Sequence, residues 1–230
     1  MTYDLLIGDR LHSSWSLRGW LMFVKFGLPV QIHQTRLYSD QFAKDLSDWA
    51  PARLVPVMRT PEGDVIGDTI AMGETLHDRH PEAGLWPSDP SARALARWTV
   101  AEMHSGFSAL RGDCPMNLFH LWDKFEPSPA VLADVARMEE MWTLARSRFG
   151  TGGPWLFGRY SLADVFFAPA ATRFATYQLP MGETAAAYVK MHLSDPAFLE
   201  WRATGLASDT ELSQYDMGLP HAPWPGSAAG

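Results

Sequence analysis

Three serines near the start of the chain are placed where a hydroxyl group could stabilise an anion. Ser13, Ser14 and Ser16 follow a short apolar run, residues 3–7, and the apolar periodicity that begins at Trp15 predicts a helix. We expect this helix to begin near Ser14, so the hydroxyl groups lie beside the positive end of its dipole. Stabilisation of a bound thiolate is chemistry that such a hydroxyl could perform.

The energy that this chemistry requires is within reach of one hydroxyl group. A free thiol titrates near ~8.5, and lowering its pKa by about two units takes roughly 2.7 kcal/mol of preferential stabilisation of the thiolate. One charge-assisted hydrogen bond and a helix N-terminus together supply about that amount. The alternative is that a serine at this turn only caps the helix, and one serine could cap while its neighbour acts on the thiolate.

A second stretch, residues 54–79, has the features of a site for an extended, anionic peptide. It places Pro56 between Val55 and Val57, although proline cannot donate a hydrogen bond within a strand. A cis Val55–Pro56 bond would turn the backbone N–H and C=O groups of Val57 outward, where they could pair with another peptide.

A short hairpin and a helix follow this proline. Asp68 precedes the amphipathic segment, and the first turn of a helix that begins at Thr69 would offer free N–H groups to a carboxylate. An ordinary hairpin with an ordinary helix cap is the alternative. The order of the parts (a strand opened by proline, a turn, a strand, an acidic and hydroxyl pair, a helix) favours the binding site.

The composition excludes several other functions. A net charge of -7 argues against a nucleic-acid surface, which needs a basic face, and gives no reason for attraction to anionic lipid. No apolar run is long enough to span a bilayer, and the first residues lack the pattern of a signal peptide, so we expect a cytoplasmic protein. The single cysteine, Cys114, excludes an intramolecular disulfide, a CxxC redox pair and a cysteine-built metal site, and we expect no metal.

The elements that would position these residues have the order strand, helix, strand, helix, hairpin, helix. The expected strands are 3–7, 30–37, 55–57 and 64–66, and the expected helices are 14–26, 39–49 and one from 69 onward. This is the order of a thioredoxin-like α/β domain, in which the first two strands are parallel because a right-handed crossover joins them. A proline-rich segment, residues 81–90, then predicts a linker.

From residue 91 the periodicity is helical, which predicts an all-α bundle over residues 91–210. Two apolar stripes predict its core: Leu95, Trp98, Met103, Phe107 and Leu110, then Leu132, Val135, Met138, Trp142, Ala145 and Phe149. Ser161 and Asp164 have the spacing of a capping box, which predicts the start of a further helix. The tail, residues 211–230, has no periodicity and either wraps over the surface or is mobile.

These stretches resemble the glutathione S-transferase family. In its thioredoxin-like domain a cis-proline strand holds the cysteinyl unit of glutathione, and an acidic or amide residue followed by serine, here Asp68-Thr69, holds the γ-glutamyl unit. The segment from Ser13 to Arg18 is similar to the serine-type zeta and theta classes and their bacterial relatives. The capping box resembles that of the central helix in the family's all-α domain, so the resemblance covers both halves of the chain.

The resemblance implies a glutathione-binding domain at residues 1–80 and a second-substrate pocket in the all-α domain. It implies Ser13 as the catalytic hydroxyl, with Ser14 second and Ser16 third. The residues implied for binding glutathione as a co-substrate are Trp15, Leu54, Val55, Val57, Asp68 and Thr69. Those implied for the pocket are His104, Phe107 and Arg111. Family members are usually homodimers, so we expect a homodimer that binds glutathione and a small electrophile.

Three functions are open on the sequence alone. The first is a glutathione transferase, whose bound thiolate attacks an electrophilic carbon in a mostly apolar pocket. The second is a zeta-like cis-trans isomerase of the maleylacetoacetate type, for which Arg111 would attract an acidic substrate. The third is a transferase fold without turnover that serves in protein interaction or glutathione sensing.

Overall fold

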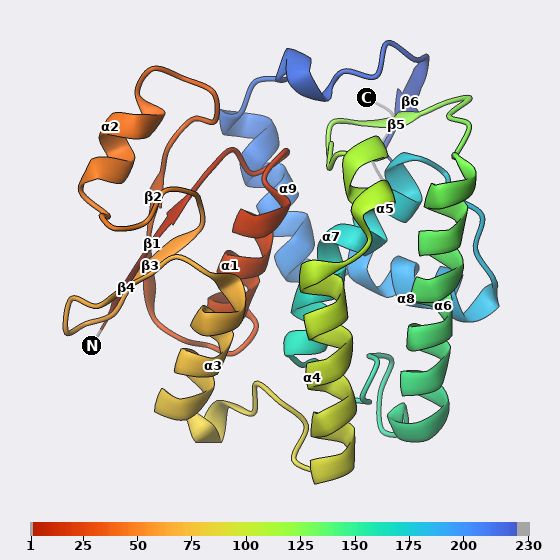
Figure 1. Ribbon diagram of the computed structural model, residues 1–230, viewed down its shortest axis with the longest axis horizontal. Coiled ribbons are helices and arrows are strands. Elements are labelled where there is room, and N and C mark those ends of the chain that lie inside the picture. Colours follow the sequence, from red (N-terminus) through yellow and green to blue (C-terminus); the bar gives the residue numbers. More distant parts are fainter. Residues whose placement is uncertain (1, 225–230) are drawn as a thin grey trace.

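The computed structural model describes residues 2–224 and consists of two halves that lie side by side (Figure 1). The first half contains a mixed four-stranded sheet with helices, and the second half is helical. The predicted fold class, a thioredoxin-like domain followed by an all-α domain, is therefore confirmed. None of the helices within the described range is long and apolar enough to cross a membrane.

The sheet has the strand order β2-β1-β3-β4. Its strands are β1 (Tyr3–Ile7), β2 (Val30–Gln34), β3 (Val57–Arg59) and β4 (Val65–Ile66). β1 is parallel to β2, as the predicted crossover requires, and it is antiparallel to β3. β1 lies at the centre of the sheet because its apolar run is buried on both faces.

The helices of the first half are α1 (Ser14–Val24), α2 (Phe42–Ser47) and α3 (Thr69–Arg79). α1 and α3 lie between the sheet and the helical half, whereas α2 lies on the far side of the sheet (Figure 1). Gly19 brings α1 close to Pro56, since a Cβ atom at Gly19 would lie 2.9 Å from the proline ring. The serine turn and the Pro56 segment therefore lie side by side.

The second half begins with the short 3-10 helix η1 (Pro81–Ala83), which lies in the predicted linker. Its α-helices are α4 (Pro90–Ser105), α5 (Ser108–Asp113), α6 (Pro129–Phe149), α7 (Leu162–Thr176), α8 (Glu183–Leu193) and α9 (Pro196–Ser208). α7 is the core helix, because all its residues except Ala175 are buried. Most of the predicted stripes face α7 or its neighbours, but the stripe prediction was wrong for two residues. Trp98 is 55% exposed and Leu132 is 39% exposed.

The predicted capping box fixes the start of α7. The Asp164 carboxylate accepts hydrogen bonds from the Ser161 backbone N–H (2.8 Å), the Leu156 N–H (3.1 Å) and the Tyr188 hydroxyl (2.9 Å). Burial raises the pKa of Asp164 to about 6, and these donors oppose that rise.

The tail wraps over the molecule as far as residue 224, passing from α9 across the top of both halves (Figure 1). It contains the 3-10 helix η2 (Ser213–Tyr215) and the strand β6 (His221–Pro223), which pairs with β5 (His120–Trp122). Just before the tail, at the end of α9, Asp209 accepts hydrogen bonds from the Leu11 N–H (2.9 Å) and the Gln34 side chain (3.0 Å). Residues 225–230 of the predicted tail lie outside the described residues.

Candidate active site

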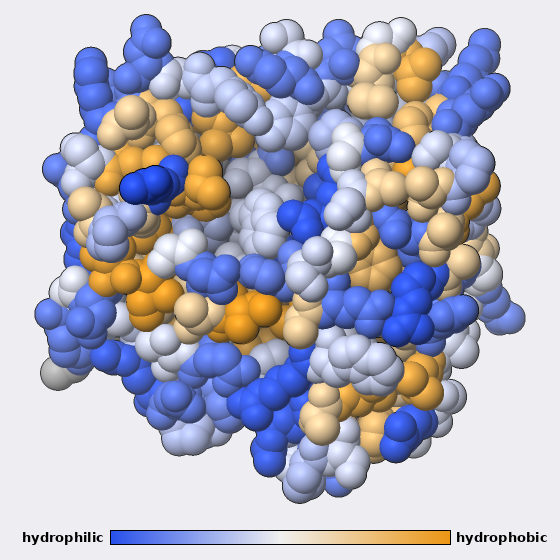
Figure 2. Space-filling model, viewed as in Figure 1, coloured by the Kyte–Doolittle hydropathy of each residue, from blue (hydrophilic) through white to orange (hydrophobic). Residues whose placement is uncertain are grey.

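A cavity of about 690 Å³ lies where the first half faces the second, and the space-filling view is hollowed there (Figure 2). α1, the Pro56 segment and the start of α3 form one side, and α4, α5 and α7 form the other. Nine of the eleven predicted site residues line it: Ser13, Ser14, Trp15, Leu54, Val55, Asp68, Thr69, His104 and Arg111. Segments that are far apart in the sequence therefore meet at one site.

Two of the predicted site residues, Val57 and Phe107, do not line the cavity. Val57 is fully buried and pairs with Leu6 across the sheet, so its side chain packs in a core cluster behind the cavity. Phe107 is 6% exposed, and its left-handed backbone (φ 57°) turns it into the core where α4 ends. The neighbouring residues Val55 and Ser108 take their places in the cavity lining.

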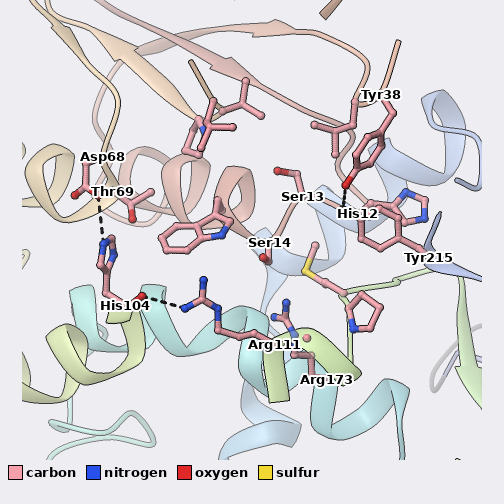
Figure 3. A pocket seen from close by; sticks show the side chains of 18 of the residues that line it. His12, Ser13, Ser14, Tyr38, Asp68, Thr69, His104, Arg111, Arg173 and Tyr215 are labelled. Carbon is pink, nitrogen blue, oxygen red and sulfur yellow. Dashed lines mark hydrogen bonds and ion pairs between the residues drawn. The ribbon is translucent and has the colours of Figure 1, made fainter. Parts of the chain in front are cut away.

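The serines lie at the N-terminus of α1, as predicted. Ser13 is the N-cap: its Oγ accepts from the Ser16 N–H (3.3 Å) and donates to Ser16 Oγ (2.7 Å). Ser14 is the first helical residue, is half-buried, and its hydroxyl has no partner within residues 2–224. The backbone N–H of Trp15 also has no acceptor there. Figure 3 shows the Ser14 hydroxyl on the side of Arg111 and Arg173, and the Ser13 hydroxyl on the opposite side.

The segment before Pro56 exposes unpaired backbone. The Val55–Pro56 peptide bond is cis, as expected from the sequence. The N–H and C=O groups of Val55 form no backbone hydrogen bond within the described chain. Val57, in contrast, belongs to β3. The groups free to pair with an extended peptide thus belong to the residue before the proline rather than to the residue after it.

Asp68 and Thr69 form the N-terminus of α3 at one end of the cavity (Figure 3). One carboxylate oxygen of Asp68 accepts from the N–H groups of Ile70 (2.8 Å) and Ala71 (3.0 Å). Its other oxygen lies 3.3 Å from Nε2 of His104, which comes from α4 in the other half. Thr69 is buried, and its hydroxyl has no partner in the part of the chain that the structure describes.

Arginines without acidic partners surround Trp15 and the floor of the cavity. Arg18 and Arg111 lie 4.5 and 5.1 Å from the Trp15 ring centroid. Backbone carbonyl groups accept hydrogen bonds from the guanidinium groups of Arg18, Arg111 and Arg173. Arg18 donates to Phe166, Arg111 to His104 and Gly106, and Arg173 to Cys114 and Pro169. Among the described residues no carboxylate lies within 4 Å of these groups. The site therefore carries uncompensated positive charge.

Several residues that line the cavity were not predicted from the sequence. They lie mainly at the end of the cavity away from Asp68, where Tyr38, from the loop after β2, and Tyr215, from the tail, place their hydroxyl oxygens 3.5 Å apart (Figure 3). His12 packs beside Tyr215, and neither of its ring nitrogens has a partner in the described residues. For His12, the only signal in the sequence was its position next to Ser13. The tail has no sequence pattern that would place Tyr215 at the cavity.

Burial sets the protonation of the two histidines in the cavity. It lowers the pKa of His12 to about 4, against the opposing effect of Asp209 and Glu211, so this imidazole is neutral near neutral pH. Burial also lowers the pKa of His104, and the nearby charges of Arg18 and Arg111 add to that effect, while Asp68 opposes it. Cys114 lies in the core, where burial raises the pKa of its thiol to about 12, so it is not a thiolate nucleophile.

The arrangement suits an extended peptide that carries a thiol and charged ends. A helix N-terminus and Asp68 lie at one end, unpaired backbone at Val55 lies in the middle, and hydroxyl groups stand beside both. Two of the arginines, Arg111 and Arg173, line the remaining space, where they would attract an anionic group of a second molecule.

Comparisons with known proteins found similar sequences. Two family models match, the N-terminal domain of glutathione S-transferase over residues 12–79 and its C-terminal domain over residues 128–204. The chain is 31% identical over 134 residues to maleylacetoacetate isomerase of Pseudomonas aeruginosa, covering 54% of this chain and 59% of that protein. It is 26% identical over 176 residues to maleylacetoacetate isomerase of Rattus norvegicus, covering 75% of this chain and 78% of that protein.

Solved structures share the fold at lower identity. A glutathione transferase homolog from Burkholderia gl BGR1, with bound glutathione, has a TM-score of 0.66 at 21% identity, covering 91% of this chain and 100% of that one. Glutathione transferase Omega 3C from Trametes versicolor has a TM-score of 0.65 at 20% identity, covering 86% of this chain and 88% of that one.

Proposed function

We propose that this chain, which belongs to the glutathione S-transferase family, is an enzyme. It binds glutathione in the cavity and uses the glutathione thiol as a nucleophile. The observation that carries the proposal is the meeting of three features in one cavity. They are the serine turn, the unpaired backbone of Val55 and the free end of α3.

These features would hold glutathione in one orientation. Its γ-glutamyl carboxylate would accept hydrogen bonds from the N–H and hydroxyl groups of Thr69, and its ammonium group would pair with the free oxygen of Asp68. Its cysteinyl unit would pair with the backbone of Val55. This orientation directs the sulfur towards the N-terminus of α1 and the hydroxyl of Ser13.

We assign the stabilisation of the thiolate to Ser13, with the free N–H of Trp15 adding to it. The Ser13 hydroxyl donates to Ser16 in the structure, so its proton must turn to the sulfur. A hydrogen bond between neutral groups contributes about 1 kcal/mol net, whereas one to a charged group contributes about 1.5–3 kcal/mol, so the turn is favourable. Ser14 faces the arginines instead, where the second substrate would lie.

Paired alanine substitutions test this assignment. Ser13→Ala is expected to lower turnover with a generic aromatic electrophile about ten-fold or more, while calorimetry still detects glutathione binding. Ser14→Ala is the matched control, since it removes a hydroxyl from the adjacent residue. An equal loss from Ser14→Ala, with none from Ser13→Ala, would transfer the role to Ser14.

A second candidate function, the glutathione-dependent isomerase, is favoured by the arginines and by the two isomerase relatives. Arg111 and Arg173 would bind the carboxylates of a cis dicarboxylic substrate. The thiolate would add reversibly to the double bond and be expelled after rotation. The isomerase would be established if turnover on such a substrate exceeds turnover on a neutral aromatic electrophile. A binding module would be established if the protein is retained on immobilised glutathione but turns over neither substrate.

We also propose a cytoplasmic homodimer, following the family. The 55% exposed side chain of Trp98 on α4 is consistent with a face that a second copy covers. Light scattering at micromolar concentration, with Trp98→Ala as the comparison, tests the dimer.

A further inference from the structure

The hydroxyl group of Ser13 is part of a buried chain of hydrogen bonds. Ser13 Oγ lies 2.7 Å from Ser16 Oγ, which in turn accepts from the backbone N–H of Gly8 at 3.0 Å. Ser16 has no exposed surface, and Ser13 is 7% exposed. The chain thus links the end of β1, through the first turn of α1, to the wall of the cavity.

Capping of the helix does not require the Ser16 hydroxyl. The cap consists of Ser13 Oγ and the backbone N–H of Ser16, so any residue other than proline at position 16 could supply the donor. Serine is also a weaker helix former than alanine, because its hydroxyl competes for backbone groups. Within residues 2–224, the hydroxyl hydrogen of Ser16 has no acceptor of its own while Ser13 donates to it.

We propose that Ser16 is a positioning residue for activation of the glutathione thiol, an inference that rests on the function proposed above. In the free protein it holds the Ser13 hydroxyl at the end of α1. When Ser13 turns its proton to the sulfur, Ser16 donates its own proton to the oxygen of Ser13. The Gly8 N–H, Ser16, Ser13 and the thiolate then form one chain in which every donor points towards the negative charge.

The physical gain comes from polarisation along this chain. A hydroxyl that accepts two hydrogen bonds is a stronger donor, and such strengthening is estimated at about 10–30% per bond. With Ser16 in place, Ser13 Oγ accepts from both the backbone N–H and the hydroxyl of Ser16 while it donates to the sulfur. Without the Ser16 hydroxyl, Ser13 retains the cap but loses one of these two donors.

The experiment is a titration of the thiol in the complex of glutathione with the full chain, followed by thiolate absorbance as a function of pH. Ser16→Ala is expected to raise the thiol pKa by about half a unit to one unit while the glutathione Kd at low pH changes less than about three-fold. Ser16→Thr, which restores a hydroxyl, is expected to return the pKa towards that of the parent. Ser16→Cys keeps the volume and offers only a weak donor, so it should also raise the thiol pKa. It replaces Ser16→Ala if the alanine variant folds poorly.

The outcomes separate this inference from the proposed function. A merely structural Ser16 would lower the melting temperature without moving the thiol pKa, and that result would overturn the inference. If Ser13→Ala raises the pKa and neither Ser16→Ala nor Ser16→Cys does, the role of Ser13 stands and that of Ser16 falls. If Ser13→Ala leaves the pKa unchanged, or if glutathione does not bind at all, both fall together.

Discussion

Replacement of Asp68 by asparagine separates the two tasks that this side chain would perform. One oxygen caps α3 through the N–H groups of Ile70 and Ala71, and the other is open to the cavity beside His104. Asparagine caps a helix about as well as aspartate, so Asp68→Asn keeps the first task. It removes the negative charge that would pair with the ammonium group of glutathione.

The expected loss of affinity follows from the exposure of this carboxylate. A hydrogen bond between charged groups contributes about 1.5–3 kcal/mol when it is well shielded, and an exposed ion pair contributes about 0.2–1 kcal/mol. The Asp68 side chain is 52% exposed, so we take about 1–2 kcal/mol. That range corresponds to a Kd for glutathione that rises about 5- to 30-fold.

Calorimetry with glutathione, and with an analogue that lacks the ammonium group, is the assay. The analogue is expected to bind the parent and Asp68→Asn within about two-fold, because no charge pair is at stake. Asp68→Ala is the comparison for the cap, and it should lower the free energy of unfolding by about a further 1 kcal/mol. If Asp68→Asn binds glutathione as tightly as the parent while Asp68→Ala does not, the carboxylate is only a cap and the proposed orientation is refuted.

Three further predictions concern charge and stability. Arg111→Gln removes a cation that contacts no carboxylate among residues 2–224, so KM for a dicarboxylic electrophile should rise about ten-fold while KM for a neutral one stays the same. Steady-state kinetics check this, and equal changes for both substrates would contradict it. Asp164→Ala leaves the N–H groups of Leu156 and Ser161 without a buried acceptor. This should lower the free energy of unfolding in urea by about 3–5 kcal/mol. A loss below about 1 kcal/mol would disprove the role of the capping box. Burial lowers the pKa of His12 to about 4 and that of His192 to about 3, so the unfolded chain binds more protons than the folded one below about pH 6.5, and stability falls as the pH drops. The free energy of unfolding in urea should fall by about 1.6 kcal/mol per histidine between about pH 6.5 and pH 5, and His12→Phe should remove its share. An unchanged slope in that variant would show that His12 is not responsible.

The order of the elements in the first half was predictable because each element has a signal within a short stretch of sequence. The apolar run of β1, the cap at Ser13 and the proline between two valines each carry their signal in a few neighbouring residues. The capping box at Asp164 is local in the same way. Boundaries were less accurate, as in β2, which ends at Gln34 rather than at residue 37, because the sheet pairing that ends a strand involves another part of the chain.

The sequence by itself determined which chemical groups the site contains, namely the serine turn, the acidic and hydroxyl pair and the proline segment. The tertiary structure decided which of their atoms face the cavity. It placed Val55 rather than Val57 there, and it brought His104 against Asp68. It also brought Tyr38 and Tyr215 together across 177 residues of chain, a contact that no local pattern encodes. The physical reason is that helix caps and turns are stabilised by neighbours in the sequence, whereas a cavity wall depends on how separately formed elements pack.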